Sequence, residues 1–534
     1  MSYRFDENDG NFATVSDLIR HRAASHPNKK FIKFETESIS YAESNSRIDK
    51  ICWKLTAMGV SKGNKVAVML ENSLYSVETW IALARMGAVE VSIGAALKGE
   101  SLVYPLHLTE CATLITTRSI AERHKGTFDS IPSLVNVVVA EDLYAEKIRN
   151  LIHGNFRDED SIPSKGPYFV EVAPMDSAII LFSSGTTGPP KGVVLSHLAN
   201  FRLAASVVDA MNYGPDDVLF NFFPLSHVNA RYTTVLAAMI ANATAIIHGR
   251  FSASKFWDIC RENGVTAFNF MGAIPVILMA QDASANDRSH RLSKAYGSGA
   301  AGQIARDFSD RFNVKLVETY GSTELGMVTH TPLGEVSDNG TCGNATPGYE
   351  IAILGSPGTL AEPGETGEIV VRTAAPGLVF SEYYDNPTAT ADAWSDQWFH
   401  TGDRGYLDSS GALFFVDRVK DAIRRRGENI SSWEVERAVE SHPAVAEAAA
   451  IGIPSDVSGE EVLVVVVLRD SAEPESILRH AEMHLPHYAV PRYVRFVGEL
   501  PRTVSARVEK YRLRNEGLTS DAWDAESNGF RARR

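Results

Sequence analysis

Apolar and polar residues follow two different periods along the first hundred residues, and together they predict alternating helices and strands. Across residues 39–71, apolar residues first recur at helical spacing and then form the short run Lys65–Leu70, which is typical of a buried strand. Gly59 lies between the two, where the C-cap of a helix belongs. A second unit follows, with a helix ending near Gly87 and a strand over Val89–Ile93. This alternation favours an α/β fold with layered, largely parallel sheets.

The pattern changes between residues 336 and 420, where Gly, Pro, Thr and Asp are frequent and the apolar runs are short. These features predict a β-rich subdomain. A compact segment follows, in which a helix near Trp433–Ser441 precedes further strand and helix patterns, as in a small α+β domain. We therefore predict a large N-terminal domain over residues 1–417 and a small C-terminal domain over residues 418–534. The polar residues from Asn515 onward carry no apolar period and are expected to fray.

Composition and charge exclude several classes of protein. The 534 residues are 44% hydrophobic and 22% charged, which is the balance of a globular protein too long for a single core. The net charge of -14 argues against binding to nucleic acids or anionic membranes. The N-terminus lacks the order of a signal peptide, and the longest apolar run, Val462–Leu468, is too short to span a bilayer. The four cysteines include no CxxC pair, so we expect a cytoplasmic protein without disulfides.

The sharpest local signal is a strand that runs into a loop rich in Ser, Thr and Gly, over Leu181–His197. Glycines let the backbone turn tightly, hydroxyls donate hydrogen bonds, and the single Lys191 supplies positive charge, all of which suit phosphate. A Walker A loop is the obvious alternative, but that motif has Gly before its lysine and Ser or Thr after it. Pro190 and Gly192 occupy those positions here. A flexible loop without a ligand is the remaining interpretation.

From this loop onward the chain resembles the adenylate-forming superfamily of acyl-CoA synthetases, firefly luciferases and peptide-synthetase adenylation domains, whose signature loop reads much like SSGTTGPPKG. The resemblance recurs in order at PLSH (Pro224–His227), YGSGAA (Tyr296–Ala301), TYGSTE (Thr319–Glu324), HTGD (His400–Asp403), DRVKD (Asp417–Asp421), RRRGENISSWEVE (Arg424–Glu436) and ELPRTVSARVEK (Glu499–Lys510). It implies that an acid is activated with ATP, and that the small domain rotates about a hinge near Lys420.

The resemblance also implies a set of nucleotide contacts. The expected cofactor-binding residues are Ser183, Ser184, Gly185, Thr186, Thr187, Gly188, Gly299, Ala300, Ala301, Thr319, Tyr320, Gly321, Ser322, Asp403, Arg418, Lys420, Gly427 and Glu428. Tyr320 is expected to line the adenine and Asp403 to hold the ribose diol, with a further contact from Arg418. An Asp beside Gly is also typical of an ordinary turn, and an arginine at such an edge is also typical of a solvated surface.

A smaller set carries the chemistry. The expected catalytic residues are Lys191, His227, Thr323, Glu324, Arg507 and Lys510. Thr187 and Glu324 are the expected magnesium ligands, because a hydrated Mg²⁺ needs oxygen atoms beside the phosphates. His227 is either a gate beside the acyl site or a structural histidine. The acyl pocket is expected near residues 270–274 and 297–301, where packing in a core is the alternative.

One motif departs from the family. Its members usually carry Gly-Lys in the last motif, and this lysine bridges the carboxylate and the α-phosphate during adenylation. Ala506 and Arg507 occupy the pair here, and the planar guanidinium is wider than an ammonium. Either Arg507 slows adenylation or another cation serves, with Lys510 as the nearest candidate.

We therefore predict an AMP-forming acyl-CoA ligase that uses ATP, Mg²⁺ and coenzyme A. Coenzyme A is favoured because GENIS and the helix after it resemble ligases of the carnitine/crotonobetaine type. Arg424–Arg426 either meet its phosphates or form a solvated basic patch. The alternatives are transfer to a carrier-protein pantetheine, one half-reaction beside a partner ligase, and an acyl-adenylate binder that does not adenylate. The acid and the oligomeric state stay open, a homodimer included.

Overall fold

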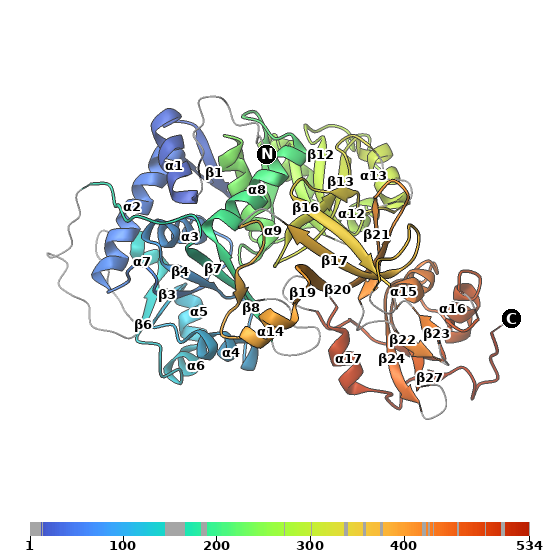
Figure 1. Cartoon of the computed structure of the whole chain (residues 1–534). Helices are drawn as coiled ribbons and strands as arrows, with labels where there is room; N and C mark the ends of the chain where they lie inside the picture. Colours follow the sequence, from blue (N-terminus) through green and yellow to red (C-terminus); the bar gives the residue numbers. More distant parts are fainter. Residues whose placement is uncertain are drawn as a thin grey trace. The chain divides into compact units, whose positions relative to one another are not determined.

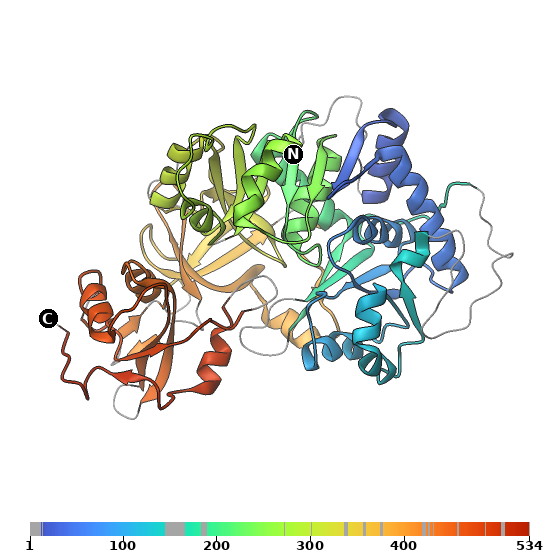
Figure 2. The ribbon, with the colours of Figure 1, turned by 180° about the vertical axis from the view of Figure 1, so that it is seen from behind.

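The computed structural model describes residues 12, 14–144, 166–182, 190–271, 273–300, 302–335, 340–355, 359–373, 377–418, 423–425, 428–430, 432–455, 459–485, 487–502 and 508–532. Figure 1 and Figure 2 show the ribbon from two sides. The chain divides into two compact units. The first comprises Met1–Ser183, Lys191–Glu350 and Arg372–Trp394, and the second comprises Ser184–Pro190, Ile351–Val371 and Ser395–Arg534. The predicted boundary near Asp417 and the hinge near Lys420 stay predictions.

The first unit contains a seven-stranded sheet whose central strands are parallel. In order across the sheet, its strands are β18 (Glu382–Tyr383), β8 (Gly192–Ser196), β7 (Ser177–Phe182), β4 (Val89–Ser92), β3 (Lys65–Met69), β5 (Thr113–Thr116) and β6 (Asn136–Val139). Strand β8 runs antiparallel to both of its neighbours, β7 and β18, and the other neighbouring pairs in this sheet are parallel. Leu106, Ile120 and Phe128 of helices α4 (Glu100–Thr109), α5 (Arg118–Arg123) and α6 (Lys125–Asp129) pack into one buried cluster with the sheet.

A nine-stranded sheet completes the framework of the first unit. Its strands, in order, are β15 (Asn344–Ala345), β14 (Gly326–His330), β13 (Lys315–Ser322), β12 (Lys294–Ser298), β11 (Ala267–Met271), β9 (Val218–Asn221), β10 (Thr244–Ile247), β1 (Lys30–Phe34) and β2 (Glu37–Ser40). The strands from β13 to β1 are parallel. A buried aromatic cluster joins them to α11 (Ala253–Asn263), α12 (Ala273–Met279) and α13 (Gln303–Phe312). The α/β class with largely parallel sheets is thus confirmed.

The remaining helices among the described residues of this unit are α1 (Val15–Ser25), α2 (Tyr41–Ala57), α3 (Leu74–Met86), α7 (Ala140–Tyr144), α8 (His197–Met211), α9 (Val228–Ala230), the π-helix η2 (Arg231–Leu236), α10 (Ala237–Ile240) and α14 (Pro387–Asp392).

The predicted helix and strand pairs near the N-terminus are confirmed, as α2 with β3 and α3 with β4. Helix α2 begins at a capping box of Ser40 and Glu43, which satisfies two backbone N–H groups at its start. Helix α3 ends at Gly87 in the left-handed conformation, with φ of 65°, as a C-cap glycine does.

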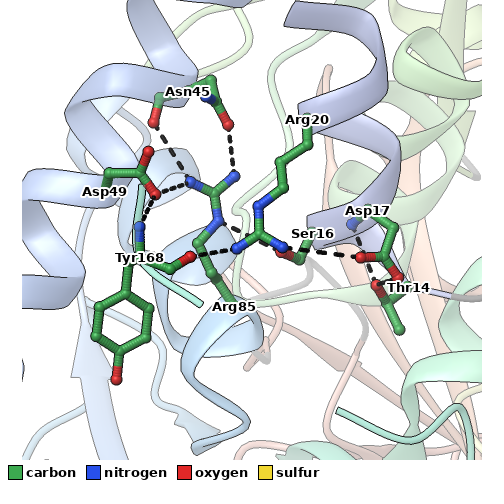
Figure 3. Close-up of polar contacts among 8 residues, drawn as sticks. All are labelled: Thr14, Ser16, Asp17, Arg20, Asn45, Asp49, Arg85 and Tyr168. Atoms are coloured by element: carbon green, nitrogen blue, oxygen red, sulfur yellow. Dashed lines mark hydrogen bonds and ion pairs between the residues drawn. The ribbon is translucent and has the colours of Figure 1, made fainter. Parts of the chain in front are cut away.

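A buried arginine ties the first three helices together (Figure 3). The guanidinium of Arg85 on α3 donates to Oδ1 of Asp49 at 2.6 Å and to Oδ1 of Asn45 at 2.7 Å, both on α2. It also donates to Oγ of Ser16 on α1, at 3.3 Å. Asp49 accepts a further hydrogen bond from the backbone N–H of Tyr168. Because Arg85 is only 1% exposed, these partners replace the water that a buried charge loses.

Two further sheets are formed by described residues that belong mostly to the second unit. The five-stranded sheet consists of β16 (Tyr349–Leu354), β17 (Gly367–Thr373), β20 (Trp398–Leu407), β19 (Trp394–Ser395) and β21 (Leu413–Arg418), and accounts for the predicted β-rich segment. The six-stranded sheet consists of β23 (Glu428–Ile430), β22 (Ile423–Arg425), β25 (Gly459–Leu468), β26 (Tyr493–Phe496), β27 (Trp523–Asp524) and β24 (Val445–Ser455). Alternating residues of β24 and β25 form two buried clusters, one on each face of the strands. One cluster includes residues of α15 (Ser432–Glu440) and α16 (Pro474–Ala481), and the other includes a residue of α17 (Lys510–Glu516).

The prediction that the chain frays from Asn515 was wrong for residues 515–532. Strand β27 pairs with β26, and the carboxylate of Asp524 receives two 3.1 Å hydrogen bonds from the guanidinium of Arg492. Ala525 and Phe530 are buried in the core of the small sheet. These two apolar side chains are separated in the sequence and form no periodic pattern, although both are buried in the fold.

All four cysteines, Cys52, Cys111, Cys260 and Cys342, are free and buried. The prediction of a chain without disulfides is therefore confirmed. Among the helices of the described residues, none combines the length and apolarity needed to cross a bilayer.

Candidate functional site

The predicted phosphate loop joins the antiparallel strands β7 and β8. Phe182 at the end of β7 pairs with Gly192 at the start of β8, so the strand pairing brings the two ends of the loop together. Residues 183–189 lie outside the described part of the chain. Lys191 directly precedes β8, and its side chain is exposed. A short loop between paired strand ends, with a lysine where the loop meets β8, is the local arrangement that the phosphate hypothesis requires.

The TYGSTE segment forms the end of β13 and its turn into β14. Ser322 pairs with Gly326 across this turn, and the backbone N–H of Leu325 donates to Oγ of Ser322 at 3.3 Å. A Cβ atom on Gly321 would lie 1.9 Å from the carbonyl oxygen of Gly326, so only glycine fits at position 321. The turn itself carries Glu324 with its neighbour Thr323, both half-buried.

Tyr383 of strand β18 connects the two predicted phosphate elements. Its hydroxyl donates a 3.0 Å hydrogen bond to Oε1 of Glu324. The ammonium nitrogen of Lys191 lies 4.4 Å from the centroid of the same ring. Burial and the adjacent Glu324 carboxylate raise the pKa of Tyr383 above its usual value of 10, so its hydroxyl is a donor at neutral pH. The structure therefore brings Lys191 and Glu324 to one side chain, with Lys191 over the face of the ring and Glu324 at its hydroxyl.

A buried carboxylate holds the predicted adenine turn. The backbone N–H groups of Gly299 and Ala300 both donate to Glu318, the second at 3.1 Å. Burial raises the pKa of Glu318 to about 7, against the opposing effect of these two hydrogen bonds. Thr319 lies next to it and donates from Oγ1 to the carbonyl oxygen of Thr329 at 2.7 Å. Glu318 was not among the predicted site residues, although a charged residue inside an apolar strand is a signal in itself.

Tyr320 is buried in this strand, with 7% exposed. Its backbone N–H donates to Oγ1 of Thr329 at 3.2 Å. A buried ring belongs to the core as readily as to an adenine pocket. Its predicted contact with adenine stays a prediction.

His227 is half-buried and lies at the N-terminus of the short helix α9. The segment before it is held by Arg231, whose Nε donates to the carbonyl oxygen of Leu225 at 3.0 Å. The same guanidinium forms a bidentate pair with Glu90 at 2.6 and 2.7 Å. Both charged groups are almost fully buried. The ion pair between Arg231 and Glu90 thus helps to hold the segment that precedes His227, and no sequence pattern predicted this pair.

The expected acyl-pocket residues divide between two roles. Phe270 and Ile274 belong to the buried aromatic cluster of the nine-stranded sheet, as the packing alternative expected. Met271, between them in the chain, is half-buried. A Cβ on Gly297 would lie 2.0 Å from the carbonyl oxygen of Phe270. Close packing of β11 against β12 therefore explains part of this motif.

In the second unit, Asp403 lies in β20 directly opposite Arg418 of β21. Asp403 is 9% exposed, and its backbone N–H donates to Oγ1 of Thr401 at 3.1 Å. Gly402, with φ of 70°, donates its N–H to Glu368 at 3.2 Å. The two predicted ribose residues are thus neighbours across one strand pair.

Lys510 is engaged within the small sheet and its helices. Its ammonium lies 2.8 Å from Oε1 of Glu436 and donates to Oγ of Ser432 at 2.6 Å. Both partners belong to α15, whereas Lys510 begins α17. A role in adenylation requires Lys510 to leave this pair.

The proposal that Arg424–Arg426 meet the phosphates of coenzyme A was wrong for Arg425. Its side chain is buried, pairs with Glu461 at 2.6 Å, and donates to the carbonyl oxygens of Tyr488 and Val490. Successive side chains of a strand point to opposite faces of its sheet, and the side chain of Arg425 lies on a buried face of β22.

Several predicted residues stay untested. Those outside the described part of the chain are Ser183, Ser184, Gly185, Thr186, Thr187, Gly188, Ala301, Lys420, Gly427 and Arg507. Arg418 and Glu428 are placed only as backbone positions of β21 and β23.

Comparison with known proteins agrees with these motifs. Residues 19–384 match the model of the AMP-binding enzyme family, and residues 434–507 match that of the AMP-binding enzyme C-terminal domain. Crotonobetaine/carnitine–CoA ligases of Shigella sonnei and Escherichia coli are each 31% identical over 483 residues, which cover 89% of this chain and 93% of theirs.

Solved structures show the same fold over nearly the whole length. ATP-bound MatB from Rhodopseudomonas palustris is 25% identical, with a TM-score of 0.82 over 94% of this chain and 98% of its own. A fatty acyl CoA synthetase from Mycobacterium tuberculosis is 26% identical, with a TM-score of 0.72 over 95% and 99% of the two chains. The predicted superfamily and activity are thus confirmed: this chain belongs to the AMP-binding enzyme family and is an ATP-dependent, AMP-forming ligase of the acyl-CoA synthetase type.

Proposed function

We propose that this chain joins a carboxylic acid to the thiol of coenzyme A through an acyl-adenylate, with Mg²⁺ bound at Glu324. The observation that supports this most directly is the side chain of Tyr383, which contacts Lys191 through the face of its ring and Glu324 through its hydroxyl. One group is a cation for phosphate oxygens and the other is an oxygen ligand for a divalent cation. Binding of a metal-bound polyphosphate requires both.

Glu324 fits the proposed metal. A carboxylate oxygen has two lone pairs, so Oε1 can accept from Tyr383 and still coordinate a hard cation. Within the described ranges, no group of three or more His, Cys, Asp or Glu side chains forms a metal site. The ion would therefore take most of its oxygen ligands from phosphate and water, as Mg²⁺ commonly does. When bound, it neutralises charge on the phosphates.

In the first half-reaction, an oxygen of the substrate carboxylate attacks the α-phosphorus of ATP and pyrophosphate leaves. Lys191 offsets negative charge on the phosphates, and the turn held by Glu318 orients the nucleotide. Arg507 is the cation that we assign to the reacting carboxylate and α-phosphate. Such catalysis consists mainly of positioning and charge stabilisation.

In the second half-reaction, a thiol sulfur attacks the acyl carbonyl, and AMP leaves. The small C-terminal domain over residues 418–534 is proposed to rotate about Lys420 between the two steps. We favour coenzyme A as the acceptor because the relatives at 31% identity carry the name CoA ligase. Their acid, crotonobetaine or carnitine, is one candidate among many for this chain.

The test is a panel of acids assayed for pyrophosphate release with ATP and Mg²⁺, with and without coenzyme A. We expect one class of acid to stimulate release, and thioester to form only with coenzyme A. Thioester formation on a holo-carrier protein and none on coenzyme A would contradict the choice of acceptor. No acid-dependent release from any acid would contradict the whole proposal.

Variants connect this activity to the site. Lys191→Ala and Glu324→Ala should each lower acid-dependent pyrophosphate release about tenfold or more, since each removes a charged contact. Lys62→Ala and Glu350→Ala are matched controls, because each removes one partner of an exposed ion pair away from these motifs. Equal rates for all four variants and the parent would contradict the nucleotide assignment.

A further inference from the structure

The segment Phe380–Tyr384 lies between two motifs that are far apart in the sequence. At one end, the backbone N–H of Phe380 donates to the carbonyl oxygen of Glu324 at 2.7 Å. At the other end, the backbone N–H of Tyr384 donates to the carbonyl oxygen of Gly192, also at 2.7 Å. We call this segment the bridging segment, because its backbone contacts both the metal-side turn and the residue after Lys191.

The pairing of β18 with β8 fixes the register of this segment. Tyr383 pairs with Val193, and Glu382 pairs with Val194. The side chain of Tyr383 consequently lies beside the start of β8, and Lys191 directly precedes this strand. Tyr383 is only 5% exposed, and its ring is packed against Phe380 at a centroid distance of 4.9 Å. The ring therefore has little freedom to turn away from either charged group.

Tyr383 presents a different surface to each of its charged neighbours. The negative face of the ring attracts the ammonium of Lys191, whereas the hydroxyl donates to the carboxylate of Glu324. A single rigid side chain thus sets the separation between a phosphate-binding cation and a metal-binding anion. Neither interaction alone explains why a tyrosine is needed: phenylalanine supplies the ring, and serine supplies a hydroxyl.

We propose that Tyr383 is a positioning residue that holds Lys191 and Glu324 in register for the metal–ATP complex. This inference rests on the proposed function, because it assigns the metal to Glu324. The hydroxyl positions Glu324 for the metal ion, and the ring positions Lys191 for the phosphates. The two contributions are therefore separable by substitution.

The test measures ATP binding directly, by calorimetry on the full chain, in Mg²⁺ and in EDTA. Tyr383→Phe keeps the ring and removes the hydrogen bond to Glu324. We expect its Kd for ATP to rise about tenfold in Mg²⁺, as for a lost hydrogen bond to a charged group, and to stay within about twofold of the parent in EDTA. The Mg²⁺ concentration for half-maximal pyrophosphate release should rise by a similar factor, with the KM for the acid unchanged.

Tyr383→Leu removes both interactions, so ATP binding should weaken in EDTA as well, by about threefold to tenfold. Tyr384→Phe is the matched control. It removes the neighbouring hydroxyl, which accepts from Lys65 at 2.5 Å, and should leave the Mg²⁺ dependence at the parent value. If Tyr383→Leu does not fold, the conservative Tyr383→Phe variant decides the question.

Equal losses of ATP affinity in Mg²⁺ and in EDTA for Tyr383→Phe would overturn the assignment of the hydroxyl to the metal side. So would parent-like binding in both conditions. A parent that binds ATP without any effect of Mg²⁺ would overturn the metal assignment in the proposed function, and this inference with it. Failure of the inference alone is recognised by a Mg²⁺-dependent parent and an unchanged Tyr383→Phe variant.

Discussion

The backbone N–H of Ala300 donates a 3.1 Å hydrogen bond to Oε2 of the buried Glu318. The carboxylate that shapes the predicted adenine turn is therefore also a titrating group, because burial raises its pKa to about 7. The folded chain holds a proton on Glu318 over a range of pH in which the unfolded chain has lost it. This favours the folded state below the ordinary pKa of 4.5, and the stabilisation is lost as the pH rises through about 7.

Glu318→Gln removes this titration. The free energy of unfolding of the variant, relative to the parent, should increase by about 3 kcal/mol between pH 4.5 and pH 8, because the parent loses that much and the variant does not. Urea unfolding at both pH values measures it. A difference between the two proteins that is the same at both pH values would show that Glu318 does not titrate in this range.

The ion pair between Arg231 and Glu90 gives a second prediction. Glu90→Gln leaves a buried guanidinium without a counter-charge, which should lower the free energy of unfolding by about 3 to 5 kcal/mol. Arg372→Met is the matched control. It breaks an ion pair with Glu350 whose side chains are 42% and 58% exposed, and it should cost no more than about 1 kcal/mol. Similar losses in urea unfolding for the two variants would contradict this account.

A third prediction concerns Lys510, which pairs with Glu436 and Ser432. Lys510→Met should lower the stability of the small domain by about 1 to 3 kcal/mol, since a half-buried charged partner is lost. Adenylation per folded molecule should stay within about threefold of the parent. Thermal unfolding and acid-dependent pyrophosphate release measure the two effects. Loss of adenylation at unchanged stability would instead identify Lys510 as the adenylating cation.

The fourth prediction concerns Arg507. If adenylation uses this residue, its wide guanidinium is poorly suited to the place of a compact ammonium. Arg507→Lys should therefore speed the adenylation half-reaction, while thioester formation from supplied acyl-AMP changes little. Single-turnover assays of the two half-reactions separate these effects. A slower adenylation step would mean that the site is adapted to arginine, and unchanged rates in both steps would exclude this residue.

The proposed rotation about Lys420 gives the fifth prediction. Lys420→Pro restricts the backbone at that position, so adenylation should be nearly intact and thioester formation should fall about tenfold or more. Pyrophosphate release and thioester formation, measured on the same preparation, test this. Equal loss of both half-reactions would point to misfolding or to a hinge elsewhere.

Much of the fold follows from local sequence pattern. The helix and strand pairs around Gly59 and Gly87 were predicted correctly, because the apolar period and the glycines that end helices act within a few residues. Gly87 is the C-cap of α3, whereas the C-cap of α2 is Met58, one residue before Gly59. The residue pattern also predicted a strand that runs into the loop before Lys191, and β7 does end at Phe182, where this loop begins. The C-terminal segment was missed, because Ala525 and Phe530 are buried only through contacts with distant strands.

The sequence by itself determined the α/β class, the family and the chemical types at its motifs, since each of these is written in short runs of residues. Only the tertiary structure decided which side chains meet. Tyr383 is 59 residues from Glu324 in the chain, and Arg231 is 141 residues from Glu90. Such contacts depend on which strands and helices become neighbours, and no local period records that choice. For the same reason the structure, and not the run of three arginines, decided that Arg425 faces the buried carboxylate of Glu461.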